Sequence, residues 1–181
     1  MRYVMLDRVT EVVPGERGRG IKCVTLTDEI LHDHFPDFPV FPGALVVEAA
    51  AQLAGLVLEM GVNQPHPQPV SSRGEGSERA HPSGAIESGK SPLRAILAQI
   101  DKTKFYRPVE PGDTMELEAR VKGMLEGAAR VDVEANVRGE RSMRGSLTFV
   151  LRQIDSERVH EQRRYLYRLW TRGLGKDLPI P

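Results

Sequence analysis

The sequence predicts an α+β fold in which an antiparallel sheet wraps around one long buried helix. Three observations support this: an apolar stretch of helical length, segments of period-two alternation after it, and strand-like segments before it. A helix that is apolar on nearly every face must be covered all round, and a sheet that curves around it supplies that cover.

Two strands are predicted before the helix. Residues 2–13 and 20–28 are rich in Val, Ile, Leu and Thr, and Pro14 with the glycines that follow it separates them as a loop. The N-terminus carries a charge every few residues, which argues against a signal peptide. We therefore expect a cytoplasmic protein.

The central helix is expected from about Pro42 to Met60. Pro42 suits the first turn, where its missing N–H has no partner to lose, and Gly61 suits the end of the helix. Its most apolar part, residues 44–58, is shorter than the roughly 20 residues that span a bilayer. We expect a core helix and no membrane partner.

A segment rich in Pro, Gly and Ser, residues 61–92, follows the helix and is expected to be a flexible insertion. Four strands are expected next, at residues 93–104, 115–121, 129–137 and 142–153. The last three are expected to form a meander of antiparallel strands.

The tail, residues 155–181, is expected to form a helical extension to a domain that spans residues 1–154. Four apolar side chains fall roughly on one face of this helix, and Gly173 ends it. They are Val159, Leu166, Leu169 and Trp170.

Composition excludes several functions. Lys plus Arg and Asp plus Glu number 25 each among 181 residues, so no basic field favours nucleic acid. The single cysteine, Cys23, cannot form an internal disulfide, and no Cys/His spacing suggests a zinc site. We expect no metal and no other cofactor.

Three polar residues interrupt the apolar helix: Glu48, Gln52 and Glu59. Residues four and eleven positions apart are rotated by only about 40° and 20° from each other around the helix axis, so these three side chains share one stripe. We expect Glu48 to be the most deeply placed, and a desolvated carboxyl there could act as an acid that Gln52 orients. The alternative is a stripe that faces water or a subunit partner.

The loop before the helix contains His34. Prolines at every third position, Pro36, Pro39 and Pro42, favour a stiff, extended run that would place His34 reproducibly. The aromatic side chains Phe35, Phe38 and Phe41 could line a substrate tunnel or pack the loop onto the sheet.

The segments HFPDFPVFPG at residues 34–43 and EAAAQ at 48–52 resemble the active-site signature of the FabZ type of 3-hydroxyacyl-[acyl-carrier-protein] dehydratase. Residues 100–121 resemble a strand and turn of that family, and residues 1–9 resemble another of its strands. The resemblance implies a hot-dog fold and a hydro-lyase that converts 3-hydroxyacyl thioesters to trans-2-enoyl thioesters in fatty-acid or related biosynthesis.

The resemblance also implies the roles of the site residues. His34 would remove the α-proton, the main-chain N–H of Gly43 would stabilise the thioester oxygen, and Glu48 would protonate the departing hydroxyl. The implied partners are acyl carrier protein and a second copy of the chain, in a homodimer with shared active sites; a trimer of dimers is left open.

Two departures keep other functions open. Asp33 and Asp37 stand where the family usually has Gly, which could alter the base or its surroundings. The alternatives are a thioesterase on the same fold, with Glu48 activating water, and a non-catalytic acyl-binding or scaffold subunit.

Overall fold

The computed structural model describes residues 3–64, 91–125, 127–175 and 178–181. Its six strands form one antiparallel sheet in the order β1-β2-β4-β5-β6-β3. The elements are β1 Arg8–Val13, β2 Arg17–Cys23, the 3-10 turn η1 Glu29–Leu31, α1 Gly43–Val62, β3 Leu93–Phe105, β4 Thr114–Leu125, β5 Ala128–Val137, β6 Glu140–Gln153 and α2 Glu157–Trp170.

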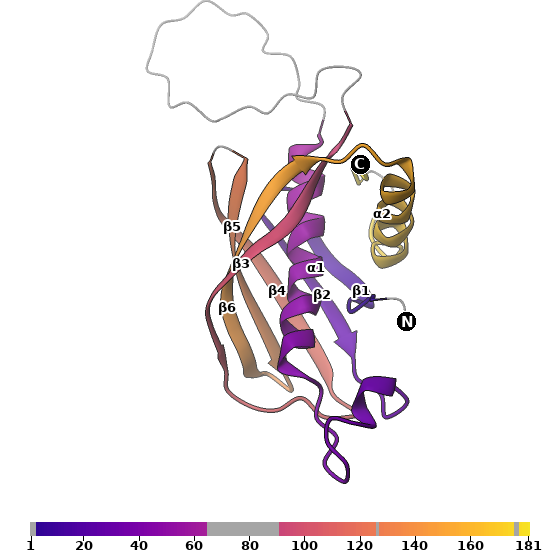
Figure 1. Ribbon diagram of the computed structural model, residues 1–181, viewed down its shortest axis with the longest axis vertical. Helices are drawn as coiled ribbons and strands as arrows, with labels where there is room; N and C mark the ends of the chain where they lie inside the picture. Colours follow the sequence, from indigo (N-terminus) through magenta and orange to yellow (C-terminus); the bar gives the residue numbers. More distant parts are fainter. Residues whose placement is uncertain (1–2, 65–90, 126, 176–177) are drawn as a thin grey trace, which may run out of the picture.

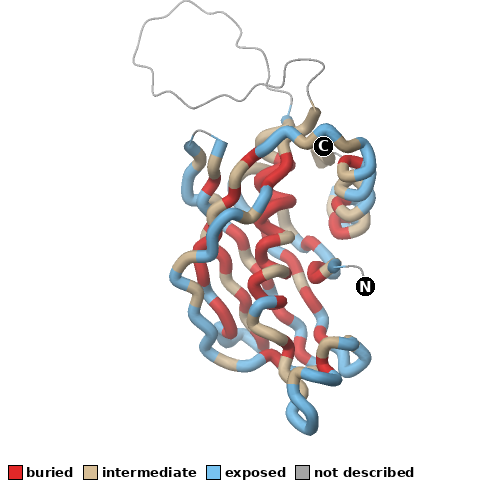
Figure 2. The backbone as a smooth tube through the Cα atoms, in the orientation of Figure 1, coloured by how far each residue is buried: buried red, intermediate tan, exposed pale blue. Residues whose placement is uncertain are grey.

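Helix α1 lies within the curve of the sheet, and the core forms around it (Figures 1 and 2). Leu53, Leu56 and Leu58 are completely buried. α1 is the one described helix that is long and apolar enough to cross a membrane, but 78% of that apolar window is buried within the fold. The predicted core helix is confirmed by its burial, whereas its length, 20 residues, does not exclude a span.

Two glycines, Gly18 and Gly61, let α1 approach the β1–β2 hairpin closely. Gly18 and Gly20 lie inside β2, and a Cβ on Gly18 would meet Val57 Cγ2 at 2.6 Å. Gly61 lies within α1, where a Cβ would meet the Cα of Gly15 at 2.3 Å. The loop between β1 and β2 is shorter than predicted, because β2 already begins at Arg17.

The meander after α1 agrees with the prediction. β4, β5 and β6 pair in sequence, and Arg138 and Gly139, both with positive φ, close the tight turn between the last two. β3 pairs with β6 on its inner side and lies at the edge of the sheet.

The predicted insertion falls largely outside the described residues. The points where it leaves and rejoins the fold are tied together, because Asn63 donates to Leu93 O at 3.0 Å and accepts from Leu93 N at 2.9 Å. α1 and β3 are thus held side by side at this end of the molecule (Figure 1).

The predicted C-terminal helix is present as α2, but its buried face differs from the expected one. His160, Tyr167 and Trp170 are buried. Leu169, which we expected on that face, instead lines a shallow surface hollow beside Arg164 and Arg168. The apolar pattern of the sequence did not predict the buried face of α2, because two of the residues buried there, His160 and Tyr167, carry polar groups.

Candidate active site

His34 directly precedes a tight turn, Phe35 to Phe38, rather than lying in the extended run that the prolines suggested. Phe38 N donates to Phe35 O, and Phe35 N donates to Phe38 O, both at 3.0 Å. Between them Asp37 adopts a φ of 62°, and Pro36 precedes it, which is the pattern of a type II turn. The chain reverses at Asp37 because Asp tolerates this left-handed conformation better than most residues.

The turn fixes the imidazole of His34. Val40 N donates to His34 O at 2.8 Å, and His34 Nδ1 lies 2.8 Å from Val40 O. A carbonyl oxygen can only accept, so Nδ1 carries the proton of this bond. In the neutral imidazole Nε2 then holds the free lone pair, as a general base requires.

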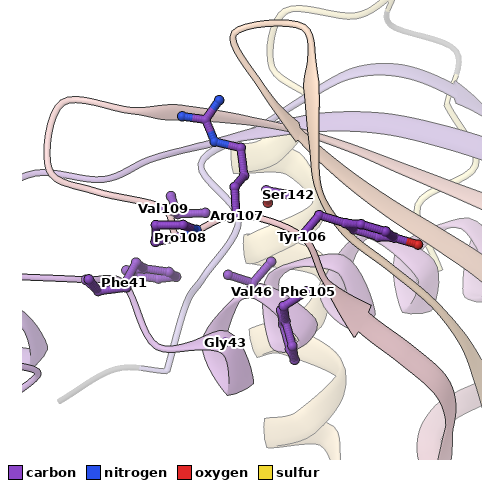
Figure 3. A pocket seen from close by; sticks show the side chains of 10 residues that line it. Phe41, Gly43, Val46, Phe105, Tyr106, Arg107, Pro108, Val109 and Ser142 are labelled. Atoms are coloured by element: carbon purple, nitrogen blue, oxygen red, sulfur yellow. The ribbon is translucent and has the colours of Figure 1, made fainter.

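A cavity of about 420 Å³ opens at the first turn of α1 (Figure 3). Its lining includes Gly43, Val46 and Phe105, and also Val40, the hydrogen-bond partner of His34. The first N–H groups of a helix have no acceptor within the helix and lie at the positive end of its dipole. The N–H of Gly43 is therefore available for an anion or a polarised carbonyl.

Gly43 also makes room for an aromatic ring. A Cβ at this position would stand 3.0 Å from two ring carbons of Phe105, a tighter approach than side chains normally make. Figure 3 shows Phe105 beside Gly43, whereas Arg107 points away from both. The ring thus walls the cavity next to the helix N-terminus.

The three phenylalanines of the loop have different surroundings. Phe41 is buried and lines this cavity. Phe35 is 54% exposed and stacks on the His34 ring, with centroids 4.2 Å apart, and Phe38 is 59% exposed. Of these three phenylalanines, only Phe41 lies where a substrate bound in this cavity of the same chain would contact it.

Glu48 and Gln52 form the pair that their spacing predicted. Gln52 Nε2 donates to Glu48 Oε1 at 2.9 Å and to Tyr3 O at 3.0 Å. Its Oε1 accepts from Met5 N at 2.9 Å. Every polar atom of the Gln52 amide is thereby engaged, and one carboxylate oxygen of Glu48 is held in place.

Glu48 lines a second cavity of about 390 Å³ between α1, β3 and α2. Gly43 lines the first cavity, at the start of α1 and before Glu48 along the helix. Among the described residues, no hydrogen bond joins His34 to Glu48. Within the described residues of one chain, the candidate base and acid thus share neither a hydrogen bond nor the lining of either of these two cavities.

Glu59, the third residue of the stripe, is the most deeply buried, which corrects the expectation for Glu48. It is fully buried, accepts from Ala95 N at 3.0 Å, and pairs with Arg94 at 2.8 Å. Arg94 in turn donates to His160 Nδ1 from Nη2 at 2.9 Å. The Glu59 carboxylate thus joins α1 to β3 and α2 and has a structural role.

Sequence reasoning missed Arg94 and His160. A carboxylate in an apolar helix requires a buried partner, so Glu59 signalled that a cation must exist. The sequence alone did not indicate which of the many arginines would lie beside it. The Val40 carbonyl also left no signal, because any residue offers one.

Known proteins resemble this chain over most of its length. The family model of the FabA-like domain matches residues 1–75. A protein of Clostridioides difficile named 3-hydroxyacyl-[acyl-carrier-protein] dehydratase FabZ is 31% identical over 149 residues, which cover 82% of this chain and 87% of the relative. One of the same name from Alkaliphilus metalliredigens is 34% identical, covering 82% of this chain and 84% of the relative.

Solved structures identify the fold. A hot-dog-like protein of Thermanaerovibrio acidaminovorans has a TM-score of 0.55 at 16% identity, and the match covers 83% of this chain and 93% of that one. The predicted hot-dog fold, an antiparallel sheet around a long central helix, is confirmed.

Proposed function

Because the chain belongs to the FabZ-type family of 3-hydroxyacyl-[acyl-carrier-protein] dehydratases, we propose that it removes water from a 3-hydroxyacyl thioester to give a trans-2-enoyl thioester. The observation that carries this proposal is the bond from His34 Nδ1 to Val40 O, which leaves Nε2 as a base. Its substrate would arrive on acyl carrier protein, as the names of the relatives state for those proteins.

The reaction begins with a proton transfer. Nε2 of His34 takes a proton from carbon 2 of the acyl chain, and the electron pair moves toward the thioester oxygen. The N–H of Gly43 at the start of α1 stabilises the negative charge on that oxygen. The cavity beside Gly43 accommodates the thioester.

The second step breaks the bond between carbon 3 and its hydroxyl. Glu48 in its acid form gives its proton to the departing oxygen, so that water leaves and the double bond forms between carbons 2 and 3. The imidazolium and the Glu48 carboxylate then return to their starting forms by proton exchange with solvent. Gln52 holds the Glu48 carboxyl in place during this step.

We propose that the complete site needs two copies of the chain, with His34 of one copy facing Glu48 of the other. β3 supports this arrangement, because it is a long strand at the sheet edge with exposed apolar side chains. Ile96, Ile100 and Phe105 are 43%, 52% and 53% exposed. Such an edge favours pairing with a second strand.

The decisive experiment gives the purified protein a 3-hydroxyacyl thioester of acyl carrier protein and identifies the product by mass spectrometry. A dehydratase yields the enoyl thioester, whereas a thioesterase yields the free hydroxy acid. The enoyl product must disappear in His34→Ala and in Glu48→Gln while both variants stay folded. Free acid, or no product at any chain length, would overturn the proposal.

A further inference from the structure

The second cavity has a wall that comes from outside the sheet and α1. On the premise of the proposed dehydratase function, we infer that this cavity holds the acyl chain of the substrate and that α2 closes it. We further infer that Gly55 and Leu166 set the length of the acyl chain that it accepts. Its volume of about 390 Å³ lies within the roughly 300–1,000 Å³ of small-molecule sites.

The chemistry of the substrate assigns the acyl chain to this cavity. The hydroxyl that leaves is on carbon 3, and the rest of the chain continues from carbon 3, away from the thioester. Glu48, which would protonate that hydroxyl, lines the cavity. Leu97, Phe149 and Leu166 supply an apolar part of its lining, while Gln162 and Arg163 of α2 supply a polar part.

Gly55 marks an open part of this cavity. It lies seven residues after Glu48, so it shares the same face of α1 about 10 Å further along the helix axis. A Cβ added to Gly55 would meet no heavy atom within 4 Å, although α1 is buried on most sides. A glycine in a helix interior costs about 1 kcal/mol relative to Ala, and here it leaves space that a side chain would fill.

α2 supplies the opposite wall through Val159, Leu166 and Trp170. Its position is fixed, because Arg94 joins His160 of α2 to Glu59 of α1, and Trp170 is buried. Figure 1 shows α2 beside α1 on the side away from β5 and β6. The cavity therefore has a rigid boundary where the acyl chain would end.

The first test changes Gly55. Gly55→Leu should lower kcat/KM for a long 3-hydroxyacyl thioester at least about tenfold more than for a short one, since pocket discrimination of even one methylene is commonly tenfold or more. Gly55→Ala is the matched control. It should keep or raise the Tm and affect only the longest chains.

The second test enlarges the cavity. Leu166→Ala should shift the preference toward longer chains, while Tyr165→Ala, at an exposed site on the same helix, should leave it unchanged. Chain-length profiles of Gly55→Leu and Leu166→Ala that match the wild type would overturn the inference and leave the dehydratase proposal standing. Absence of enoyl product in the wild type would instead overturn the proposed function itself.

Discussion

Gln52 connects the Glu48 carboxyl to the N-terminal segment of the chain. Met5 N donates to Gln52 Oε1, so the amide nitrogen must face Glu48 Oε1, 2.9 Å away. If the side-chain amide of Gln52 were rotated by half a turn, its N–H group would face the N–H of Met5. Its oxygen would face the oxygen of Glu48, so neither hydrogen bond could form. The orientation of the candidate acid therefore depends on a backbone segment 43 residues earlier in the sequence.

Replacing Gln52 with Leu should lower kcat by about ten- to hundredfold with a smaller effect on KM, because the acid loses its orientation while the cavity keeps its shape. The Met5 N–H also loses its acceptor, which should cost about 1–3 kcal/mol of stability in urea denaturation. Gln153→Leu, at an exposed position at the end of β6, is the control. A Gln52→Leu enzyme with wild-type kcat would show that Glu48 needs no such support.

Mixing two inactive variants tests the shared site. If His34 of one chain works with Glu48 of the other, a heterodimer of His34→Ala and Glu48→Gln has one intact site and one doubly altered site. Random exchange of subunits at equal concentrations should then restore about a quarter of the wild-type activity. The measurement is enoyl product formed after the variants are mixed and equilibrated.

Sites contained within single chains predict a different result. Every site in the mixture would then lack either the base or the acid, and the activity would stay at the level of the separate variants. Mixing each variant with the double variant His34→Ala, Glu48→Gln is the control, since it creates no intact site under either arrangement.

The sequence predicted the elements better than their contacts. The period-two alternation located β4 and β5, and the spacing of Glu48 and Gln52 predicted their hydrogen bond. The prolines misled, because an extended run and a turn at Pro36 satisfy the same backbone limits, and the left-handed φ of Asp37 decides between them. Local sequence also contains no information about a partner such as Arg94, which lies 35 residues from Glu59.

Asp37 gives a test of the turn that positions His34. Its φ of 62° costs a residue with a Cβ about 1 kcal/mol or more, and glycine avoids that cost. Asp37→Gly should therefore be neutral or stabilising by up to about 1 kcal/mol and should retain activity. Asp37→Val should lose about 2 kcal/mol and impair turnover, because β-branched residues fit this conformation worst.

Urea denaturation of these two variants, with kcat/KM measured alongside, checks the prediction. The comparison also shows what the departure from the family's usual glycine does at this position. A destabilised Asp37→Gly beside an unaffected Asp37→Val would mean that the Asp37 side chain, rather than its backbone conformation, supports the loop.

Tyr167 on α2 predicts a loss of stability at high pH. Burial raises the pKa of its phenol well above the usual value, and the neighbouring Glu59 carboxylate adds to the rise. Above pH of about 10 the phenol ionises in the unfolded chain but stays protonated in the folded one. The folded state then binds more protons, so its stability falls by about 1.4 kcal/mol per pH unit until the folded pKa is reached.

Denaturation midpoints measured across this alkaline range should fall less steeply in Tyr167→Phe than in the wild type, because the variant has no phenol to ionise at that position. Tyr165→Phe is the matched control, since Tyr165 lies two residues earlier on α2 and is 57% exposed. Equal slopes in Tyr167→Phe and the wild type would show that α2 opens before the phenol titrates. The wall that α2 gives to the second cavity would then be held less firmly than the contacts of Arg94 and Trp170 indicate.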